Sequence, residues 1–217
     1  MAASLGKVFW LGGSPCAGKS SISEILASRF DLDVYHVDEA FETQVQCVDA
    51  VHQPALMKWR ESSWNERWMQ PTEILIQQVI TCYQEHFALV SEDIRKMSKE
   101  KSLIVEGTAL LPRQVASVLP KRSQAIWLIP SADFQIAHYS ERVWARDIVS
   151  QCNDPEAAFH NWMERDIRFA EWVEAEAIAL NLAILRVDGK QTLQENAISV
   201  GAHFQLAADR PEALRGQ

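Results

Sequence analysis

The feature that most constrains the fold is the octapeptide GSPCAGKS at residues 13–20, which fits the pattern G-x-x-x-x-G-K-[ST]. An apolar run at residues 8–11 precedes it, and apolar residues at helical spacing follow it as far as Phe30. The two glycines permit a tight turn whose backbone N–H groups point inward, and Lys19 and a helix N-terminus add positive charge. The sequence therefore predicts a strand, a phosphate-binding loop and a helix, rather than a glycine-rich turn without a ligand.

Length and charge limit what such a loop serves. The 217 residues, of which 47% are hydrophobic, suit a single α/β domain over residues 1–217. A net charge of −8 disfavours a nucleic-acid partner. The sequence contains no run of about 18 apolar residues, so no membrane span is predicted. We therefore expect a small-molecule ligand and a cytoplasmic protein, and the sequence does not predict an oligomeric state.

The cysteines are widely spaced and form no C-x-x-C pair, so neither a zinc site nor a disulfide framework is predicted. A reducing cytoplasm is the simplest environment for them. Cys16 lies inside the octapeptide. It is either a redox-sensitive thiol, if the helix dipole and Lys19 lower its pKa, or a small space-filling residue.

Five apolar runs separated by helical patterns predict a doubly wound parallel sheet flanked by helices. The predicted strands are residues 8–11, 34–37, 103–105, 125–129 and 183–187. Ligands of open parallel sheets bind beyond the carboxyl ends of the strands. Polar residues that directly follow these runs are therefore the first candidates for a site.

A long stretch at about residues 39–101 exceeds the length of a simple crossover between two strands. Helical patterns lie at residues 55–69 and 72–97 within it. We interpret this stretch as a helical insertion for substrate binding. At the other end of the chain, residues 208–217 are expected to fray.

A second helical region contains a predicted lid at about residues 138–168. The whole helical region consists of two helical blocks, residues 132–148 and 155–180. Asp154 or Asn153 is expected to cap the second block, with Pro155 at its first position. A hinge between the two blocks would let such a lid close.

Two acids follow predicted strands. Asp38 should face the octapeptide, where its carboxylate accepts a proton from a substrate hydroxyl or helps to order magnesium-bound water. The alternative role for Asp38 is to cap a helix. Glu106 precedes Gly107 and either contacts Mg²⁺ or the substrate hydroxyl, or hydrogen-bonds to fix the following turn. His36, close to Asp38, is the one histidine of interest, and the six histidines show no metal-ligand spacing.

Arg142 and Arg146 stand four residues apart, which would place both guanidinium groups on one helix face within reach of a triphosphate. Such a pair can neutralise a phosphoryl group during transfer. The alternative is surface ion pairing with neighbouring acids. Arg165 and Arg168 are weaker candidates of the same kind.

The segment at residues 59–68 holds three of the eight tryptophans together with two arginines. Its rings either wall a pocket for a flat or apolar substrate while the arginines bind an anionic group, or pack in a core. Trp64 and Arg60 are the substrate-binding candidates of this segment.

The octapeptide, Asp38 after the second strand, the run Ile104-Val105-Glu106-Gly107 and the pair Arg142 and Arg146 with Asp147 occur in an order that resembles P-loop small-molecule kinases. Within them the chain is similar to the nucleoside-monophosphate-kinase-like group. It shares features with uridine kinases and phosphoribulokinases, and with chloramphenicol phosphotransferases. The glycine that often follows the lid Arg-Asp pair in uridine kinases is absent, and the tryptophan-rich segment matches no substrate-binding sequence of these families.

The resemblance implies a P-loop NTPase fold, ATP and Mg²⁺ as cofactors, and Asp38 as base, with Lys19, Arg142 and Arg146 as further catalytic residues. Ser20 and Glu106 would hold the metal, and Asp188 would lie near the adenine. The implied nucleotide-binding residues are Gly13, Ser14, Pro15, Cys16, Ala17, Gly18, Lys19, Ser20, Ser21 and Asp188. The predicted activity is ATP-dependent phosphorylation of a hydroxyl group on a small molecule. The alternatives are an ATPase or switch that acts on a protein partner, and a non-enzymatic phosphate binder.

Overall fold

A computed structural model describes residues 7–97 and 100–206. The two ends of the predicted 1–217 domain, including the tail at 208–217, lie outside the described residues. Within those ranges, no helix combines the length and the apolar character that a crossing of the bilayer needs.

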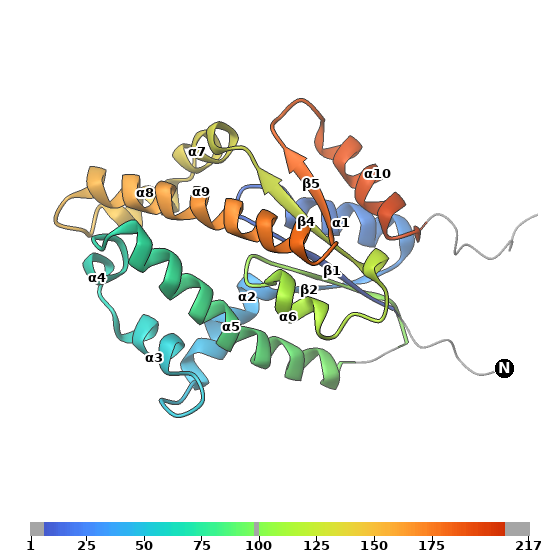
Figure 1. Cartoon of the computed structure of the whole chain (residues 1–217), viewed down its shortest axis with the longest axis horizontal. Coiled ribbons are helices and arrows are strands. Elements are labelled where there is room, and N and C mark those ends of the chain that lie inside the picture. The colour runs from blue at the N-terminus through green and yellow to red at the C-terminus, as the bar shows by residue number, and fades with distance from the viewer. Residues whose placement is uncertain (1–6, 98–99, 207–217) are drawn as a thin grey trace, which may run out of the picture.

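The core of the molecule is a five-stranded, all-parallel sheet with the strand order β2-β3-β1-β4-β5 (Figure 1). The strands are β1 (Val8–Gly13), β2 (Asp33–His36), β3 (Leu103–Glu106), β4 (Ala125–Pro130) and β5 (Ala183–Val187). All five predicted strands are confirmed, and most are one or two residues longer than the apolar runs. The second strand begins and ends one residue earlier than predicted because Val37 already starts a helix.

Helices cover both faces of the sheet. They are α1 (Lys19–Phe30), α2 (Val37–Gln44), α3 (Pro54–Glu61), α4 (Trp64–Trp68), α5 (Thr72–Lys96), α6 (Pro112–Ala116), α7 (Ala132–Ser140), α8 (Val143–Val149), α9 (Pro155–Ala179) and α10 (Leu193–His203), with short 3-10 turns at Val45–Cys47 and Arg122–Gln124. Side chains alternate across β1, so Phe9 and Leu11 pack with α1 and α10, whereas Trp10 packs on the opposite face with α5 and α9. Figure 1 shows α5 and α9 side by side on that face.

The single helical pattern predicted at residues 55–69 is wrong, because two helices, α3 and α4, form there. Ser63 has an extended backbone and starts α4 with a capping box. Its hydroxyl accepts a hydrogen bond from the Glu66 N–H at 3.3 Å, and the Glu66 carboxylate accepts one from the Ser63 N–H at 2.8 Å. This reciprocal cap favours the start of a new helix at Trp64 over continuation of α3 beyond Glu61.

The predicted block at residues 132–148 is likewise divided, into α7 and α8. Arg142 is the extended N-cap residue of α8, so Arg142 and Arg146 do not lie on one continuous helix face as the spacing predicted. The second block is confirmed as α9. Its cap is Asp154, which accepts a hydrogen bond from the Ala157 N–H at 3.0 Å, with Pro155 at the first helical position.

Candidate active site

The octapeptide forms the predicted loop between β1 and α1, at the carboxyl end of the sheet. Gly13 has φ 123° and Gly18 has φ 81°, backbone conformations that favour glycine. A Cβ on Gly13 would lie 2.1 Å from the Leu128 carbonyl oxygen. Gly18 caps α1 without a side-chain hydrogen bond, and the first turn of α1 contains no acid. The N–H groups at this helix end can therefore serve an anion.

Lys19 lies in the loop with 6% of its surface exposed. Its Nζ donates hydrogen bonds to the Ser14 carbonyl oxygen at 2.9 Å and to the Thr108 hydroxyl at 3.3 Å. Burial lowers the pKa of Lys19, while the charges of Asp38 and Glu106 oppose that shift. The buried ammonium group has only neutral oxygens as hydrogen-bond partners here, which a phosphate oxygen can replace.

Gln135 of α7, which sequence reasoning missed, hydrogen-bonds to two residues of the loop. Its Nε2 donates to the Ser14 hydroxyl oxygen at 2.9 Å and to the Pro15 carbonyl oxygen at 3.1 Å. The Ser14 hydroxyl in turn donates to the Asp166 carbonyl oxygen at 3.3 Å. No sequence pattern marks Gln135, because only the packing of α7 against the loop brings it there.

Glu106 is buried where β3 lies between β1 and β2, in register with Leu11 and His36. Its Oε1 accepts a hydrogen bond from the Ser20 hydroxyl at 3.1 Å and lies 2.7 Å from His36 Nδ1. Its Oε2 is buried and has no hydrogen-bond partner within residues 7–97 and 100–206. A buried carboxylate oxygen of this kind beside a serine hydroxyl fits Mg²⁺, which prefers oxygen ligands and takes the rest from phosphates and water. The described residues contain no cluster of three His, Cys, Asp or Glu side chains suited to a metal.

Asp38 lies in the first turn of α2, and the N-cap of that helix is His36, so Asp38 is not the cap. Its Oδ1 accepts a hydrogen bond from the Thr108 N–H at 3.3 Å. Its charge acts on Lys19 in the loop, and also on Tyr83 of α5, whose pKa is raised mainly by burial. Asp38 therefore stands between the loop and the helices of the insertion.

The predicted lid residues lie in different environments. The Arg142 guanidinium lies over the rings of Tyr139 and Trp144, 5.2 and 5.5 Å from their centroids, and its charge acts on Cys16 and Lys19. Arg146 is exposed and donates a hydrogen bond to the Ser140 carbonyl oxygen. Of the two arginines in the predicted lid, Arg142 therefore acts electrostatically on the loop.

Two further residues predicted for the nucleotide site are Cys16 and Asp188. Burial raises the pKa of the Cys16 thiol and outweighs the charges of Arg142 and Lys19. Of the two alternatives for Cys16, the direction of this shift favours the small space-filling residue, which adopts φ 64°, over a redox-sensitive thiol. Asp188 follows β5, and its carboxylate pairs with Lys190 Nζ at 2.6 Å on the surface.

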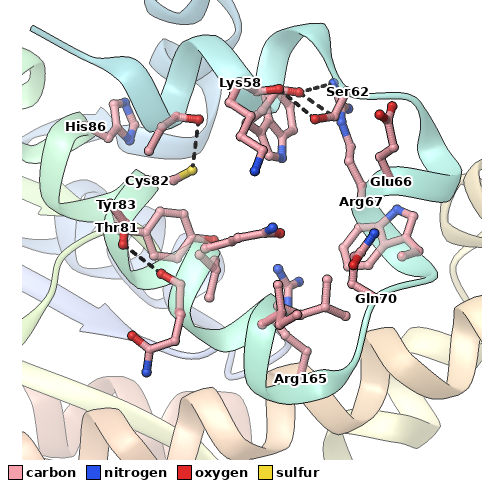
Figure 2. Close-up of a pocket in the computed structure, with 18 of the residues that line it drawn as sticks. Lys58, Ser62, Glu66, Arg67, Gln70, Thr81, Cys82, Tyr83, His86 and Arg165 are labelled. Atoms are coloured by element: carbon pink, nitrogen blue, oxygen red, sulfur yellow. Dashed lines mark hydrogen bonds between the residues drawn. The ribbon is translucent and has the colours of Figure 1, made fainter.

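A cavity of about 800 Å³ opens beside Asp38, between the helices of the insertion and α9 (Figure 2). From the tryptophan-rich segment, Trp59, Arg67 and Trp68 line it. Arg60 and Trp64, the predicted substrate contacts, are not among its lining residues. Arg60 donates to the Val45 and Gln46 carbonyl oxygens at 3.4 and 3.3 Å. Trp64 packs against the Arg67 guanidinium, 4.5 Å from its ring centroid.

The two weaker arginine candidates separate clearly. Arg165 lines the cavity and pairs with the buried Asp166 carboxylate at 2.6 Å. Arg168 pairs on the surface with Glu164 and Glu73. Only Arg165 of these two belongs to the candidate site.

No family model matches the chain, and no curated protein matches it. Among solved structures, a shikimate kinase from Bacteroides thetaiotaomicron is 10% identical with a TM-score of 0.53, over 93% of this chain and 99% of that one. A gluconokinase from Sinorhizobium meliloti 1021 is 16% identical with a TM-score of 0.48, over 94% of each chain. With the sheet order and the loop, the likeness to the Bacteroides protein shows that this chain has the α/β P-loop fold found in small-molecule kinases.

Proposed function

We propose that the protein transfers the γ-phosphoryl group of ATP to a hydroxyl group of a small molecule. The position of Asp38 is the observation that carries this proposal. Its carboxylate acts electrostatically on Lys19 in the phosphate loop and on Tyr83 of α5, and it borders the cavity. A base at that place can serve an acceptor in the cavity and a donor in the loop at the same time.

The donor side would use the backbone N–H groups of residues 13–20 and the Lys19 ammonium group to hold the β- and γ-phosphates. Ser20 and Glu106 would hold Mg²⁺, as their hydrogen bond and the unpartnered Glu106 Oε2 support. When bound, the metal would neutralise charge on the phosphate oxygens. Asp188, which follows β5 at the same edge of the sheet, would border the adenine.

The transfer step then follows from charge and position. Asp38 accepts the proton of the acceptor hydroxyl, whose oxygen forms a bond to the γ-phosphorus as the bond to the β–γ bridging oxygen breaks and ADP leaves. Arg142, whose charge acts on the loop, would stabilise the negative charge on the moving group, with Arg146 joining if the lid of residues 138–168 closes. Closure would also exclude water, which otherwise competes with the acceptor.

The test is ADP production with and without a panel of nucleosides, sugars, polyols, hydroxy acids and phenicol- or aminoglycoside-like compounds. At least one class should stimulate turnover. In Asp38→Asn, acceptor-dependent turnover should fall by about 10²–10⁴-fold while ATP still binds. Asp133→Asn, an exposed acid of α7, is the matched control and should leave turnover unchanged.

Equal turnover in Asp38→Asn and the unaltered protein would remove Asp38 as the base. ATP hydrolysis that no acceptor stimulates, but that a protein partner does, would overturn the proposal in favour of an ATPase or switch. ATP binding without any hydrolysis would indicate a non-enzymatic binder.

A further inference from the structure

The cavity beside Asp38 is large and strongly aromatic. At about 800 Å³ it lies in the range that holds drug-sized ligands. Its wall includes the rings of Phe41, Trp59, Trp68, Tyr83 and His86. A small polyol would leave most of these rings without contact. The wall instead matches a flat or bulky apolar body.

The same wall carries an excess of positive charge. Lys58, Arg67 and Arg165 line the cavity, and Figure 2 shows Lys58 and Arg67 on one side of it and Arg165 on the other. Among the residues that the structure describes, neither Lys58 nor Arg67 forms an ion pair within 4 Å. Of the two acids in the lining, Asp38 is the proposed base. The other, Glu66, caps α4 through Ser63, so its carboxylate is engaged.

Arg67 is held rigidly but by neutral groups. Its Nε and Nη2 donate to the Trp59 carbonyl oxygen at 3.1 and 2.7 Å. Its guanidinium lies 3.9 Å from the ring centroid of Trp59 and 4.5 Å from that of Trp64. Burial lowers the pKa of Arg67, since no carboxylate compensates its charge. A preorganised, uncompensated guanidinium at a cavity wall is suited to bind an anionic group.

The opposite side of the cavity contains unmet hydrogen-bond donors. Arg165 Nε and Trp68 Nε1 are both buried and have no hydrogen-bond partner among the described residues, and the Arg165 guanidinium lies 4.8 Å from the Trp68 ring centroid. Buried donors without partners cost free energy, which a ligand oxygen or a small shift on ligand binding would recover. The wall therefore offers buried donors to a ligand acceptor, in addition to the positive charge of Lys58 and Arg67.

We propose that the cavity takes an aromatic or similarly flat apolar compound that carries an anionic group as well as the hydroxyl that is phosphorylated. The anionic group, a carboxylate or a phosphate, lies against Lys58 and Arg67, the apolar body lies against the aromatic wall, and the hydroxyl lies at Asp38. This inference rests on the proposed function for the role of the hydroxyl, whereas binding of the anionic aromatic body can be tested alone.

The experiment measures binding by calorimetry to the full chain and, separately, ADP production. The probes are para-hydroxymethyl benzoate, para-hydroxymethyl phenyl phosphate, the neutral benzene dimethanol, and the non-aromatic anion glycerate. We expect one or both anionic aromatic probes to bind about tenfold more tightly than either of the other two. Comparison of the first two probes separates a carboxylate from a phosphate.

Two variants assign the anion site. Lys58→Gln and Arg67→Gln should each weaken binding of the anionic aromatic probe about tenfold and leave binding of the neutral probe unchanged. Arg60→Gln is the matched control, because Arg60 is in the same segment but outside the lining, and it should change neither. Arg67 also hydrogen-bonds the Trp59 carbonyl oxygen, so its replacement could disturb folding. The Lys58 side chain forms no hydrogen bond with a described residue, so Lys58→Gln tests the anion site without that complication.

The outcomes separate this inference from the proposed function. Anionic aromatic probes that bind in a Lys58-dependent way and stimulate ADP production support both. Probes that bind in that way, while no compound of the wider panel stimulates turnover, support the ligand class and overturn phosphoryl transfer. If neutral sugars or polyols stimulate turnover and the anionic aromatic probes do not bind, the ligand class is overturned and the proposed function stands.

Discussion

The phosphate loop and the helical cavity are adjacent, yet they are built in opposite ways. The loop consists of eight consecutive residues, and its shape depends on the positive φ angles of Gly13 and Gly18. The cavity is made of side chains that lie between Asp38 and Arg165 in the chain. One site is local in sequence, and the other exists only after α2, α3, α4, α5 and α9 have packed together.

The loop and the cavity also differ in how their cationic side chains are neutralised. In the loop, the positive charge of Lys19 is offset by the nearby carboxylates of Asp38 and Glu106. In the cavity wall, neither Lys58 nor Arg67 forms an ion pair within 4 Å with a carboxylate of the described residues. The comparison teaches that changes in the loop should affect every reaction of the protein, whereas changes in the cavity should affect some ligands only.

The largest effect is expected from Lys19→Met. The variant loses the buried ammonium group that would contact the phosphates, so turnover should fall by about 10³-fold or more whichever acceptor is used. Lys101→Met, which removes an exposed lysine paired with Asp31, is the control and should keep full turnover. A fall that depends on the acceptor would contradict the separation between the two sites.

Gly13→Ala tests how strictly the loop is specified. Its Cβ would lie 2.1 Å from the Leu128 carbonyl oxygen at a φ of 123°, so the free energy of unfolding should drop by more than about 3 kcal/mol. In Gly201→Ala, the new Cβ would meet the Leu26 side chain at 3.1 Å and the Phe30 ring at 3.8 Å, and the change should stay within about 1 kcal/mol. Denaturant unfolding measures both, and similar losses in the two variants would show that the loop tolerates a side chain.

A smaller effect concerns pH on the cavity side. Burial lowers the pKa of His86 from its ordinary 6.5 to about 4, and its Nε2 lies 2.6 Å from Gln44 Oε1. Because the unfolded chain binds the proton more readily, the stability due to neutral His86 is present above pH 6.5 and is lost as pH falls towards 4.

Between pH 7 and pH 5 the free energy of unfolding should therefore fall by about 2 kcal/mol more in the unaltered protein than in His86→Gln. Denaturant titrations at the two pH values measure this difference. His52→Gln, at an exposed histidine, should behave like the unaltered protein. Parallel pH profiles for the unaltered protein and His86→Gln would contradict a neutral buried imidazole.

The smallest effect is expected from Gln135→Ala. The loop loses the hydrogen bonds to Ser14 and Pro15 that hold it from behind, so ATP should bind about fivefold more weakly and unfolding should cost about 1 kcal/mol less. Gln194→Ala, on the exposed side of α10, is the control for ATP titration. Unchanged ATP affinity would mean that the backbone of residues 13–20 holds its shape without Gln135.

Sequence reasoning predicted the elements whose signals are short-range. The five strands, the helix after the loop, and the Asp154 cap with Pro155 follow from runs, spacings and caps that a few neighbouring residues specify. It failed where two local signals compete. At Ser62 and Ser63 the capping box interrupts a helical pattern, and at Arg142 an extended residue divides a second one, so the expected pairing of Arg142 with Arg146 on one face does not occur.

The sequence by itself determined that this chain forms a P-loop on a parallel sheet, with Asp38 and Glu106 at the ends of two predicted strands. Such features depend on backbone conformation and apolar periodicity, which act over a few residues. Only the tertiary structure decided that Gln135 supports the loop, that burial raises the pKa of Cys16, and that Arg67 rather than Arg60 lines the cavity. The physical reason is that desolvation, buried hydrogen bonds and uncompensated charge arise only when segments far apart in the chain pack together.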